Sequence, residues 1–188
     1  HDNGVGNISY DQIQSGIDQL NEDFSRQNPD TIDTRNTVDA PFWPISANID
    51  IQFALAKLDP NGNCTNGVER RNSPAGTYNA TDDSKHYATG GLDGWDYSMY
   101  LNVWVVNTIE SDGTGGITLG YAAFPQFAND DYGLLIRHDS YGTMGTGSGD
   151  RTLTHEIGHC LGLLHTFQGP FFGTGTGCHT TDCASHGD

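Results

Sequence analysis

Three histidines and a glutamate lie within eleven residues of this chain, in the stretch LTHEIGHCLGLLH at 153–165. Residues four apart stack on one face of a helix, so His155 and His159 would present two imidazoles that a single zinc ion can bridge. Glu156 lies three residues before His159, on the edge of the same face. From there its carboxylate can reach a water on the metal without being a ligand itself.

His165 can join the other two histidines only if the helix ends between them. A straight helix would carry His165 about 15 Å along the axis from His155 and rotate it about 120° from His159. Gly162 stands three residues after His159, and glycine readily adopts the left-handed conformation that ends helices. The sequence therefore predicts a chain reversal at Gly162 and three zinc ligands, His155, His159 and His165.

Three neutral imidazoles with one open position are typical of catalytic zinc, whereas structural zinc is usually enclosed by four ligands rich in cysteine. Zinc lowers the pKa of a bound water and polarises a substrate carbonyl, and Glu156 would act as general base. We therefore expect peptide hydrolysis without a covalent intermediate. The alternative is a pair of histidines on an ordinary helix, and the continuation through Gly162 and His165 makes the metal interpretation much more specific. The remaining histidines are expected in loops or on the surface: His1, His86, His138, His179 and His186.

The composition favours a single secreted domain. Twenty-four acidic residues against eight basic ones give a formal net charge of −16 over 188 residues, which disfavours nucleic acid and anionic membranes as partners. No stretch of the sequence has close to the about 20 consecutive apolar residues that a membrane-spanning helix needs. A start at His1 without a leader suggests a processed chain. Four cysteines, Cys64, Cys160, Cys178 and Cys183, permit disulfides in an oxidising compartment, although Cys160 can equally be a buried thiol.

The elements that position these residues can be predicted from the hydrophobic periodicity. A first helix is expected at 7–28, begun by a capping box of Ser9 and Gln12. A half-buried strand follows at 47–56, and an irregular excursion at 59–95 either covers a site or is a solvated insertion. Further strands are expected at 99–109, buried on both faces, at 116–127, stopped by Pro125, and at 132–138. The histidine helix would begin after Asp150 or Gly149. This order predicts an α+β fold, a twisted mixed sheet with two helices on one face.

With its zinc motif continued as GLLHTF, the chain resembles the metzincin zinc endopeptidases, and among them most closely the pappalysin family. The stretches ISYDQIQSGIDQLNEDF at 8–24, ANIDIQFALAKLDPNGNCTNGVERR at 47–71 and YLNVWVV at 100–106 extend the resemblance over nearly the whole chain.

The resemblance implies a metzincin-type catalytic domain over 1–188, with an upper subdomain at about 1–165 and the start of a lower subdomain at 166–188. It implies zinc ligation by His155, His159 and His165, with Glu156 as general base. An antiparallel edge strand at Gly120, Tyr121, Ala122 and Ala123 would pair with an extended peptide substrate. Relatives are secreted, made as zymogens and often bind calcium, for which Asp182 and Asp188 offer ligands here. A solvated acidic loop is the alternative for these two aspartates.

The chain departs from the family at its lower subdomain, which is expected to be largely absent. Relatives place a methionine turn beneath the metal and a tyrosine after it, whereas this chain has only Met99 and Met144 and no tyrosine after Tyr141. Two alternatives to an endopeptidase therefore stay open. One is a non-catalytic or truncated scaffold that acts in binding or assembly. The other is a structural zinc domain whose fourth ligand is His179 or Cys178.

Overall fold

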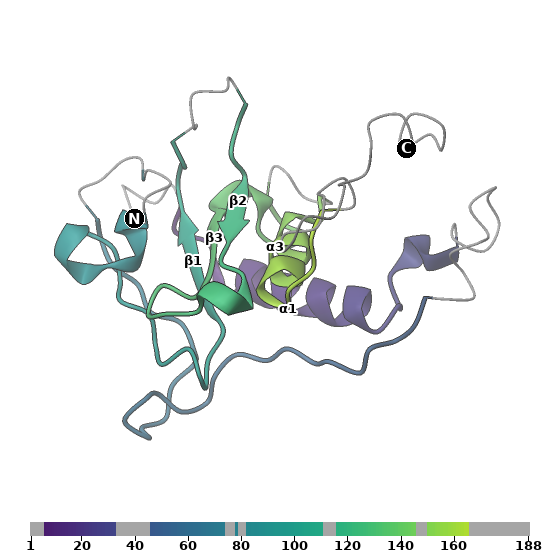
Figure 1. Cartoon of the computed structure of the whole chain (residues 1–188), viewed down its shortest axis with the longest axis horizontal. Coiled ribbons are helices and arrows are strands. Elements are labelled where there is room, and N and C mark those ends of the chain that lie inside the picture. The colour runs from purple at the N-terminus through teal and green to yellow at the C-terminus, as the bar shows by residue number, and fades with distance from the viewer. Residues whose placement is uncertain are drawn as a thin grey trace, which may run out of the picture.

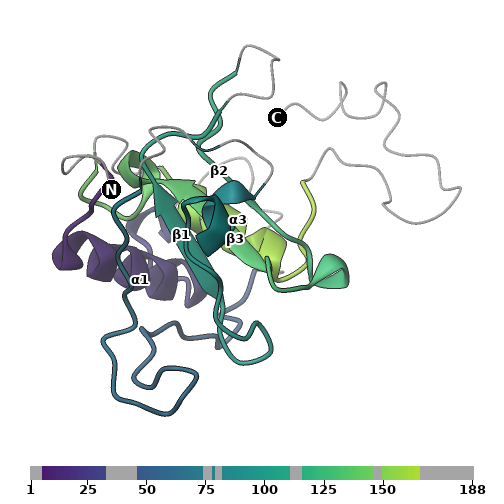
Figure 2. The same cartoon turned by 90° about the vertical axis from the view of Figure 1, so that its left-hand side faces the viewer.

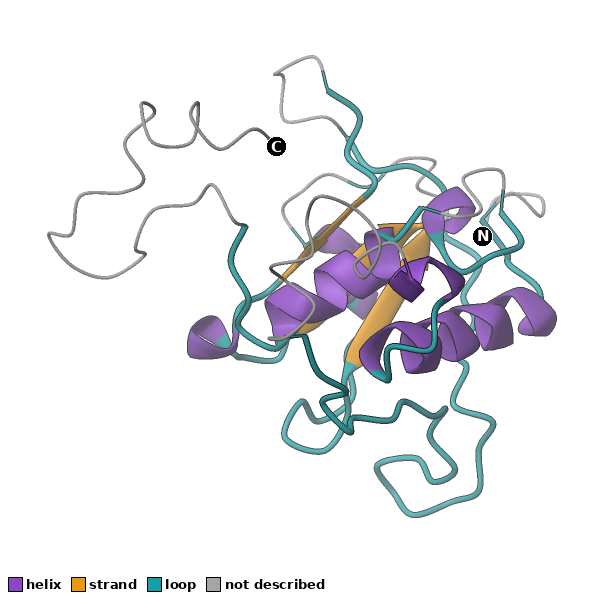
Figure 3. Ribbon diagram, turned by 90° about the vertical axis from the view of Figure 1, so that its right-hand side faces the viewer, coloured by secondary structure: helices purple, strands orange, loops and turns teal. Residues whose placement is uncertain are grey.

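The computed structural model describes residues 6–32, 46–73, 78, 82–110, 116–145 and 150–165. Its main elements are the helices α1 (Tyr10–Phe24) and α3 (Thr152–Cys160) and the strands β1 (Asn102–Val106), β2 (Gly120–Ala122) and β3 (Gly133–Arg137). Figure 1 shows the two helices beside a small sheet, and Figure 3 shows them in front of the strands. The predicted α+β class is confirmed.

The strands form one mixed sheet in the order β1-β3-β2. β1 runs parallel to β3 with Trp104 opposite Leu135, and β2 runs antiparallel to β3 with Tyr121 opposite the same residue. Because β2 stands at the end of this order, it is the antiparallel edge strand that the sequence predicts. Soon after β2, Pro125 opens a 3-10 turn, η5 (Pro125–Phe127).

β3 carries the centre of the core. Leu134, Leu135 and Ile136 have no exposed surface, since strands flank β3 on both sides and both faces of the sheet are covered. The prediction that 99–109 is buried on both faces is wrong for β1, in which Val103 is 38% exposed. Its uniformly apolar sequence fits a central strand, but β3 occupies that place.

Two apolar clusters lie on the two faces of the sheet. On one face, Leu134 and Ile136 pack with residues of α1 and α3, among them Leu20 and Ile157. On the other face, the cluster around Leu135 comprises Tyr78, Trp104, Val106 and Ile109, with Tyr121 against it. Figure 2 looks onto this second face and shows a short teal helical turn, η3 (Asp83–Lys85), in front of the strands. Part of the excursion predicted at 59–95 therefore covers the sheet.

α1 begins as predicted but is capped by half of the expected box. The Ser9 hydroxyl accepts a hydrogen bond from the Gln12 amide at 3.0 Å. The Gln12 side chain does not return to Ser9. Its Nε2 donates to the carbonyl oxygens of His138 and Tyr141 at 2.7 and 3.1 Å, which ties α1 to the chain after β3.

The strand predicted at 47–56 is wrong: this segment has no regular secondary structure and joins no ladder of the sheet. The amide side chain of Asn21 takes the place of a neighbouring strand, since Asn21 Nδ2 donates to the Phe53 carbonyl and Asn21 Oδ1 accepts from the Phe53 amide. Phe53 packs edge-on against Phe24 of α1. The segment stands off from β1, and a cavity of about 680 Å³ lies between them.

The cysteines in the described part of the chain form no disulfide. Cys64 is exposed and Cys160 is a buried thiol, which is one of the two states expected for it. Cys178 and Cys183 lie outside the described residues, as do all of 166–188. None of the helices in the described part is long and apolar enough to cross a lipid bilayer.

The central position of β3 predicts a large difference between two truncations in the same sheet. Leu134→Ala removes a fully buried side chain and is expected to lower the free energy of unfolding by about 2–5 kcal/mol. Val103→Ala, at a partly exposed position of β1, is expected to stay within about 0.5 kcal/mol of the parent. Urea unfolding followed by circular dichroism measures both, and equal losses would contradict the assigned order of burial.

Candidate metal centre

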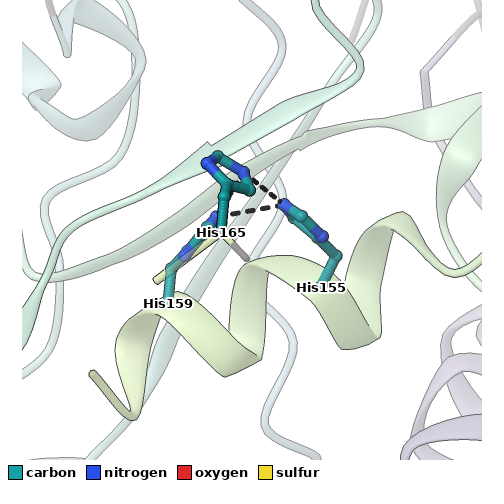
Figure 4. A group of neighbouring side chains, drawn as sticks. All are labelled: His155, His159 and His165. Atoms are coloured by element: carbon teal, nitrogen blue, oxygen red, sulfur yellow. Dashed lines mark hydrogen bonds between the residues drawn. The ribbon is translucent and has the colours of Figure 1, made fainter. Parts of the chain in front are cut away.

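The three predicted zinc ligands converge in the structure. The Nε2 atoms of His155 and His159, and those of His155 and His165, are 3.0 Å apart, and the third pair is separated by 3.1 Å. Figure 4 shows two rings rising from successive turns of α3 and the third ring facing them from the returning chain. Among the described residues this is the one cluster of histidine, cysteine or carboxylate groups suited to a metal ion.

The spacing of the three nitrogens fits a zinc ion. Imidazole nitrogens at about 2.0–2.1 Å from one ion in tetrahedral geometry stand about 3.3 Å from one another, close to the spacing found here. Burial, with the nearby rings of His159 and His165, lowers the pKa of His155. A neutral imidazole keeps the lone pair that a metal needs, so the lowered pKa of His155 favours metal binding at this residue.

A turn at Gly162 brings His165 back to the helix. α3 ends at Cys160, and Gly162 has a φ of +91°. The amide of Gly162 donates to the carbonyl of His159, and that of Leu163 donates to the carbonyl of Gly158, both at 2.9 Å. These two bonds define a Schellman motif, the common left-handed helix end. The chain reversal predicted from Gly162 is present.

The same turn orients His159, a detail that sequence reasoning missed. The Nδ1 of His159 is 2.7 Å from the carbonyl oxygen of Leu163 and must donate to it, because a carbonyl only accepts. That bond fixes the proton on Nδ1 and leaves Nε2 free as a ligand. The ring also packs against Phe124, with 5.1 Å between centroids. The sequence predicts the turn at Gly162, but it does not show that the turn brings the carbonyl of the next residue, Leu163, to His159.

Glu156 is buried beside the histidines, with 7% of its surface exposed. Burial raises the pKa of its carboxyl to about 7. A cation at the three histidines would act in the opposite direction by favouring the carboxylate. Glu156 and His155 line a cleft of about 490 Å³ together with residues 117–120, Arg151 and Thr152.

Gly120 of β2 leaves room for Glu156. A Cβ at this position would lie 3.2 Å from the Glu156 Cγ and 3.0 Å from the Leu135 carbonyl oxygen. The missing side chain therefore lets the edge strand approach the zinc helix closely. The sequence singles out Gly120 as a residue of the edge strand expected to pair with substrate, and its contact with Glu156 becomes visible in the structure alone.

The four edge residues predicted to bind substrate divide into two pairs. In an antiparallel ladder, alternate residues turn their backbone groups toward the neighbouring strand. The Ala123 amide donates to the Gly133 carbonyl, so Ala123, and by alternation Tyr121, face β3. Gly120 and Ala122 then turn their amide and carbonyl groups away from β3.

Charged contacts hold the start of α3 against α1. Arg151 lies 2.6 Å from the Asp23 carboxylate and 3.1 Å from that of Asp30. The Thr154 hydroxyl donates to the other Asp23 oxygen at 2.6 Å. The N-cap of α3 is Arg151, one residue after the predicted Asp150, and it makes no side-chain capping bond; the Asp150 side chain accepts from the Thr152 amide just before the helix. These contacts fix the helix that carries two of the three histidines.

The other predicted positions do not join the centre or lie outside the described residues. His86 contacts Asp131 with 45% of its side chain exposed, and His138 stands in a 3-10 turn after β3. The remaining positions named for calcium, for a fourth zinc ligand or as loop histidines lie outside the described residues: His1, Cys178, His179, Asp182, His186 and Asp188.

A histidine triad at the end of a short helix, beside an antiparallel edge strand, is the arrangement of the metzincin-type zinc metalloproteases. The Peptidase_M43 family model, described as pregnancy-associated plasma protein-A, matches residues 85–187. The chain belongs to this family. The resemblance to metzincins of the pappalysin family is thereby confirmed.

Relatives and solved structures agree with the assignment. An extracellular metalloprotease of Neurospora crassa is 37% identical over 83 residues, covering 40% of this chain and 27% of the relative. One from Colletotrichum graminicola is 37% identical over 98 residues, covering 48% and 32%. Mature mirolysin of Tannerella forsythia, solved with a cleaved peptide, is 37% identical with a TM-score of 0.79 over 89% of this chain and 61% of its own. The chain thus spans about a third or less of the length of the two fungal relatives.

The turn at Gly162 predicts a measurable loss of zinc affinity. Gly162→Ala places a Cβ at a left-handed φ, a strain of about 1–2 kcal/mol, so we expect zinc to bind roughly 5- to 30-fold more weakly. Competition with a chromophoric chelator measures the affinity. Gly158→Ala is the matched control, because a Cβ there meets only ordinary contacts with Leu163. Equal affinities in the two variants would contradict the role of the turn.

Proposed function

We propose that the protein is a secreted zinc-dependent endopeptidase that cleaves peptide bonds in proteins or peptides. The observation that carries the proposal is the triangle of Nε2 atoms from His155, His159 and His165, 3.0–3.1 Å apart, next to the buried carboxyl of Glu156. Membership of the M43 peptidases supports the same reaction class.

The three histidines would hold the zinc ion, and His159 is already oriented by the Leu163 carbonyl. When bound, zinc supplies a Lewis acid that polarises the substrate carbonyl and lowers the pKa of water. Three imidazoles with an open fourth position are typical of catalytic zinc, and the two residues named as alternative fourth ligands, Cys178 and His179, lie outside the described residues.

Glu156 would act as the proton carrier of the reaction. Its carboxylate accepts a proton from the attacking water and then donates it to the amine that leaves when the peptide bond breaks. The surroundings suit this exchange, since burial raises the pKa of Glu156 to about 7 and a nearby cation would lower it. A group that gains and loses a proton in one cycle works best with a pKa near the working pH.

The edge strand β2 would bind the substrate main chain. Gly120 and Ala122 turn backbone groups away from β3, and Gly120 lines the cleft, so an extended peptide can add along this edge as a further strand. Tyr121 and Ala123 would support that strand through their bonds to β3, which refines the four-residue prediction. The solved complex of mirolysin with a cleaved peptide supports a peptide ligand for this fold.

Secretion is the localisation that we propose. The names of the fungal relatives describe them as extracellular, and the net charge of −16 with few lysines is compatible with that setting. Calcium stays a prediction, because the aspartates named for it lie outside the described residues.

Removal of the Glu156 carboxylate tests the proposed function. Glu156→Gln keeps the shape of the side chain but cannot accept the proton, so kcat on a fluorogenic peptide is expected to fall by about 10²–10⁴-fold. Zinc content, measured by atomic absorption, should be unchanged because Glu156 is not a ligand.

Glu22→Gln is the control, an exposed glutamate of α1. It should leave hydrolysis unchanged, and a chelator should abolish hydrolysis in the parent. A zinc-loaded full-length protein without hydrolytic activity would favour the non-catalytic scaffold instead.

The close approach of β2 to the zinc helix gives a second test. Gly120→Ala would place a Cβ against Glu156 and the Leu135 carbonyl, so the carboxylate must shift. We expect kcat to fall by about tenfold or more, since small misplacements of catalytic groups are costly, with zinc affinity retained. Gly158→Ala, on the zinc helix itself, serves again as the control for a benign added methyl group. Unchanged kcat in Gly120→Ala would show that the close approach of Gly120 to Glu156 is not needed for hydrolysis.

A further inference from the structure

The side chain of Tyr121 enters a polar network on the sheet face opposite the zinc helix. Its hydroxyl donates to the Asp82 carboxylate at 2.9 Å. Burial and the Asp82 carboxylate raise the pKa of Tyr121 well above its usual value, so the hydroxyl keeps its proton and remains a donor. The edge strand is thus linked to the excursion that covers this face.

A buried lysine lies at the centre of the network. Lys85 is 2% exposed, and its Nζ lies 2.8 Å from the same Asp82 oxygen and 2.9 Å from the carbonyl oxygen of Asp131. The Nζ is also 5.2 Å from the ring centroids of both Trp104 and Tyr121. The ammonium group therefore has oxygen acceptors on one side and aromatic faces on the other.

Stability alone does not explain such an arrangement. Withdrawing an ammonium group from water is costly, and well-packed apolar residues are often as stable as a buried ion pair. What an ion pair with several directed contacts adds is a defined geometry. Here that geometry involves a strand, β2, that has three residues and one hydrogen-bonded neighbour in the described sheet.

Lys85 also reaches the far end of the segment that follows β2. Residues 123–130 run from the edge strand to Asp131 and include Phe124, whose ring packs on His159. Tyr121 stands just before this segment, and Asp131 closes it. Through Asp82 and its own Nζ, Lys85 is therefore connected to both ends of the segment beside the metal centre.

We propose that Lys85, Asp82 and Tyr121 are positioning residues, which hold β2 where its outward backbone groups can pair with an extended peptide substrate. This inference rests on the proposed endopeptidase function. Backbone hydrogen bonds weaken steeply with distance and angle, so an edge strand that moves loses peptide affinity. The zinc ligands stand on α3 and its turn, outside the network, and the chemical step is expected to persist.

The test uses two variants of the full-length, zinc-loaded protein. Tyr121→Phe keeps the ring and removes the hydroxyl. Asp82→Asn keeps the shape and suits the left-handed φ of +67° at this residue, but it removes the carboxylate from Lys85. For a fluorogenic peptide of about ten residues, KM should rise roughly three- to tenfold in Tyr121→Phe and more in Asp82→Asn. Turnover should stay within about a factor of two, with full zinc content.

Tyr78→Phe is the matched control. Tyr78 is a buried tyrosine of the same face whose hydroxyl bonds to Ser73 and the Gly90 carbonyl rather than to the edge strand. It should leave KM unchanged. If Tyr121→Phe and Asp82→Asn also leave KM unchanged, the proposal is wrong. It is equally wrong if kcat, zinc content and melting temperature fall together, because that result indicates a general loss of structure.

Hydrogen exchange separates this inference from the proposed function. In both variants the amides of Tyr121 and Ala123, the two that face β3, should exchange several-fold faster than in the parent, while those of β1 keep their protection. This readout needs no activity. If the parent protein hydrolyses nothing, the endopeptidase proposal fails and the exchange rates alone decide whether the network positions β2. Unchanged exchange at Tyr121 and Ala123 would overturn it.

Discussion

The left-handed turn at Gly162 is the constraint on which the metal centre depends. Two backbone hydrogen bonds, from the Gly162 amide to the His159 carbonyl and from the Leu163 amide to the Gly158 carbonyl, end the helix and send the chain back along it. The reversal delivers His165 to the two helical histidines, and it places the Leu163 carbonyl where it fixes the tautomer of His159. One backbone conformation thus supplies the third ligand and orients the second. A side chain at Gly162 would strain both functions at once.

The sheet and the helices serve this turn by holding α3 against β2. The charged contacts of Arg151 and Thr154 with Asp23 fix the beginning of α3, and Leu153 and Ile157 anchor its inner face. On the other side of the helix, the absent side chain of Gly120 lets the edge strand approach Glu156. The opposite face of the sheet holds β2 through the Tyr121 hydroxyl. The zinc helix and the edge strand are therefore each held by contacts of their own, and they meet where Gly120 lies against Glu156.

Local signals in the sequence predicted the parts of the structure that local forces determine. The Ser9 cap, the turn at Gly162 and the histidine spacing all follow from short-range stereochemistry, whereas the strand predicted at 116–127 is only Gly120–Ala122. The failures arose where distant residues decide the outcome. Periodicity at 47–56 predicted a strand, but the Asn21 side chain forms the hydrogen bonds with the Phe53 backbone that a neighbouring strand would form. β1 has the sequence of a central strand, but the position between two neighbours belongs to β3. The burial of Lys85 had no signal in the sequence, because its partners lie up to 46 residues away.

The three histidines lie within eleven residues of sequence, and this closeness has a consequence for metal exchange. All three imidazoles come from one helix and its turn, so closing this loop carries a small entropic penalty and needs no contact with the sheet. None of the three belongs to either apolar cluster. Loss of the ion would leave the interior intact, with His159 still held by the Leu163 carbonyl. A folded apoprotein that takes up its metal late is therefore consistent with this architecture, in contrast to zinc fingers, which are unfolded without metal.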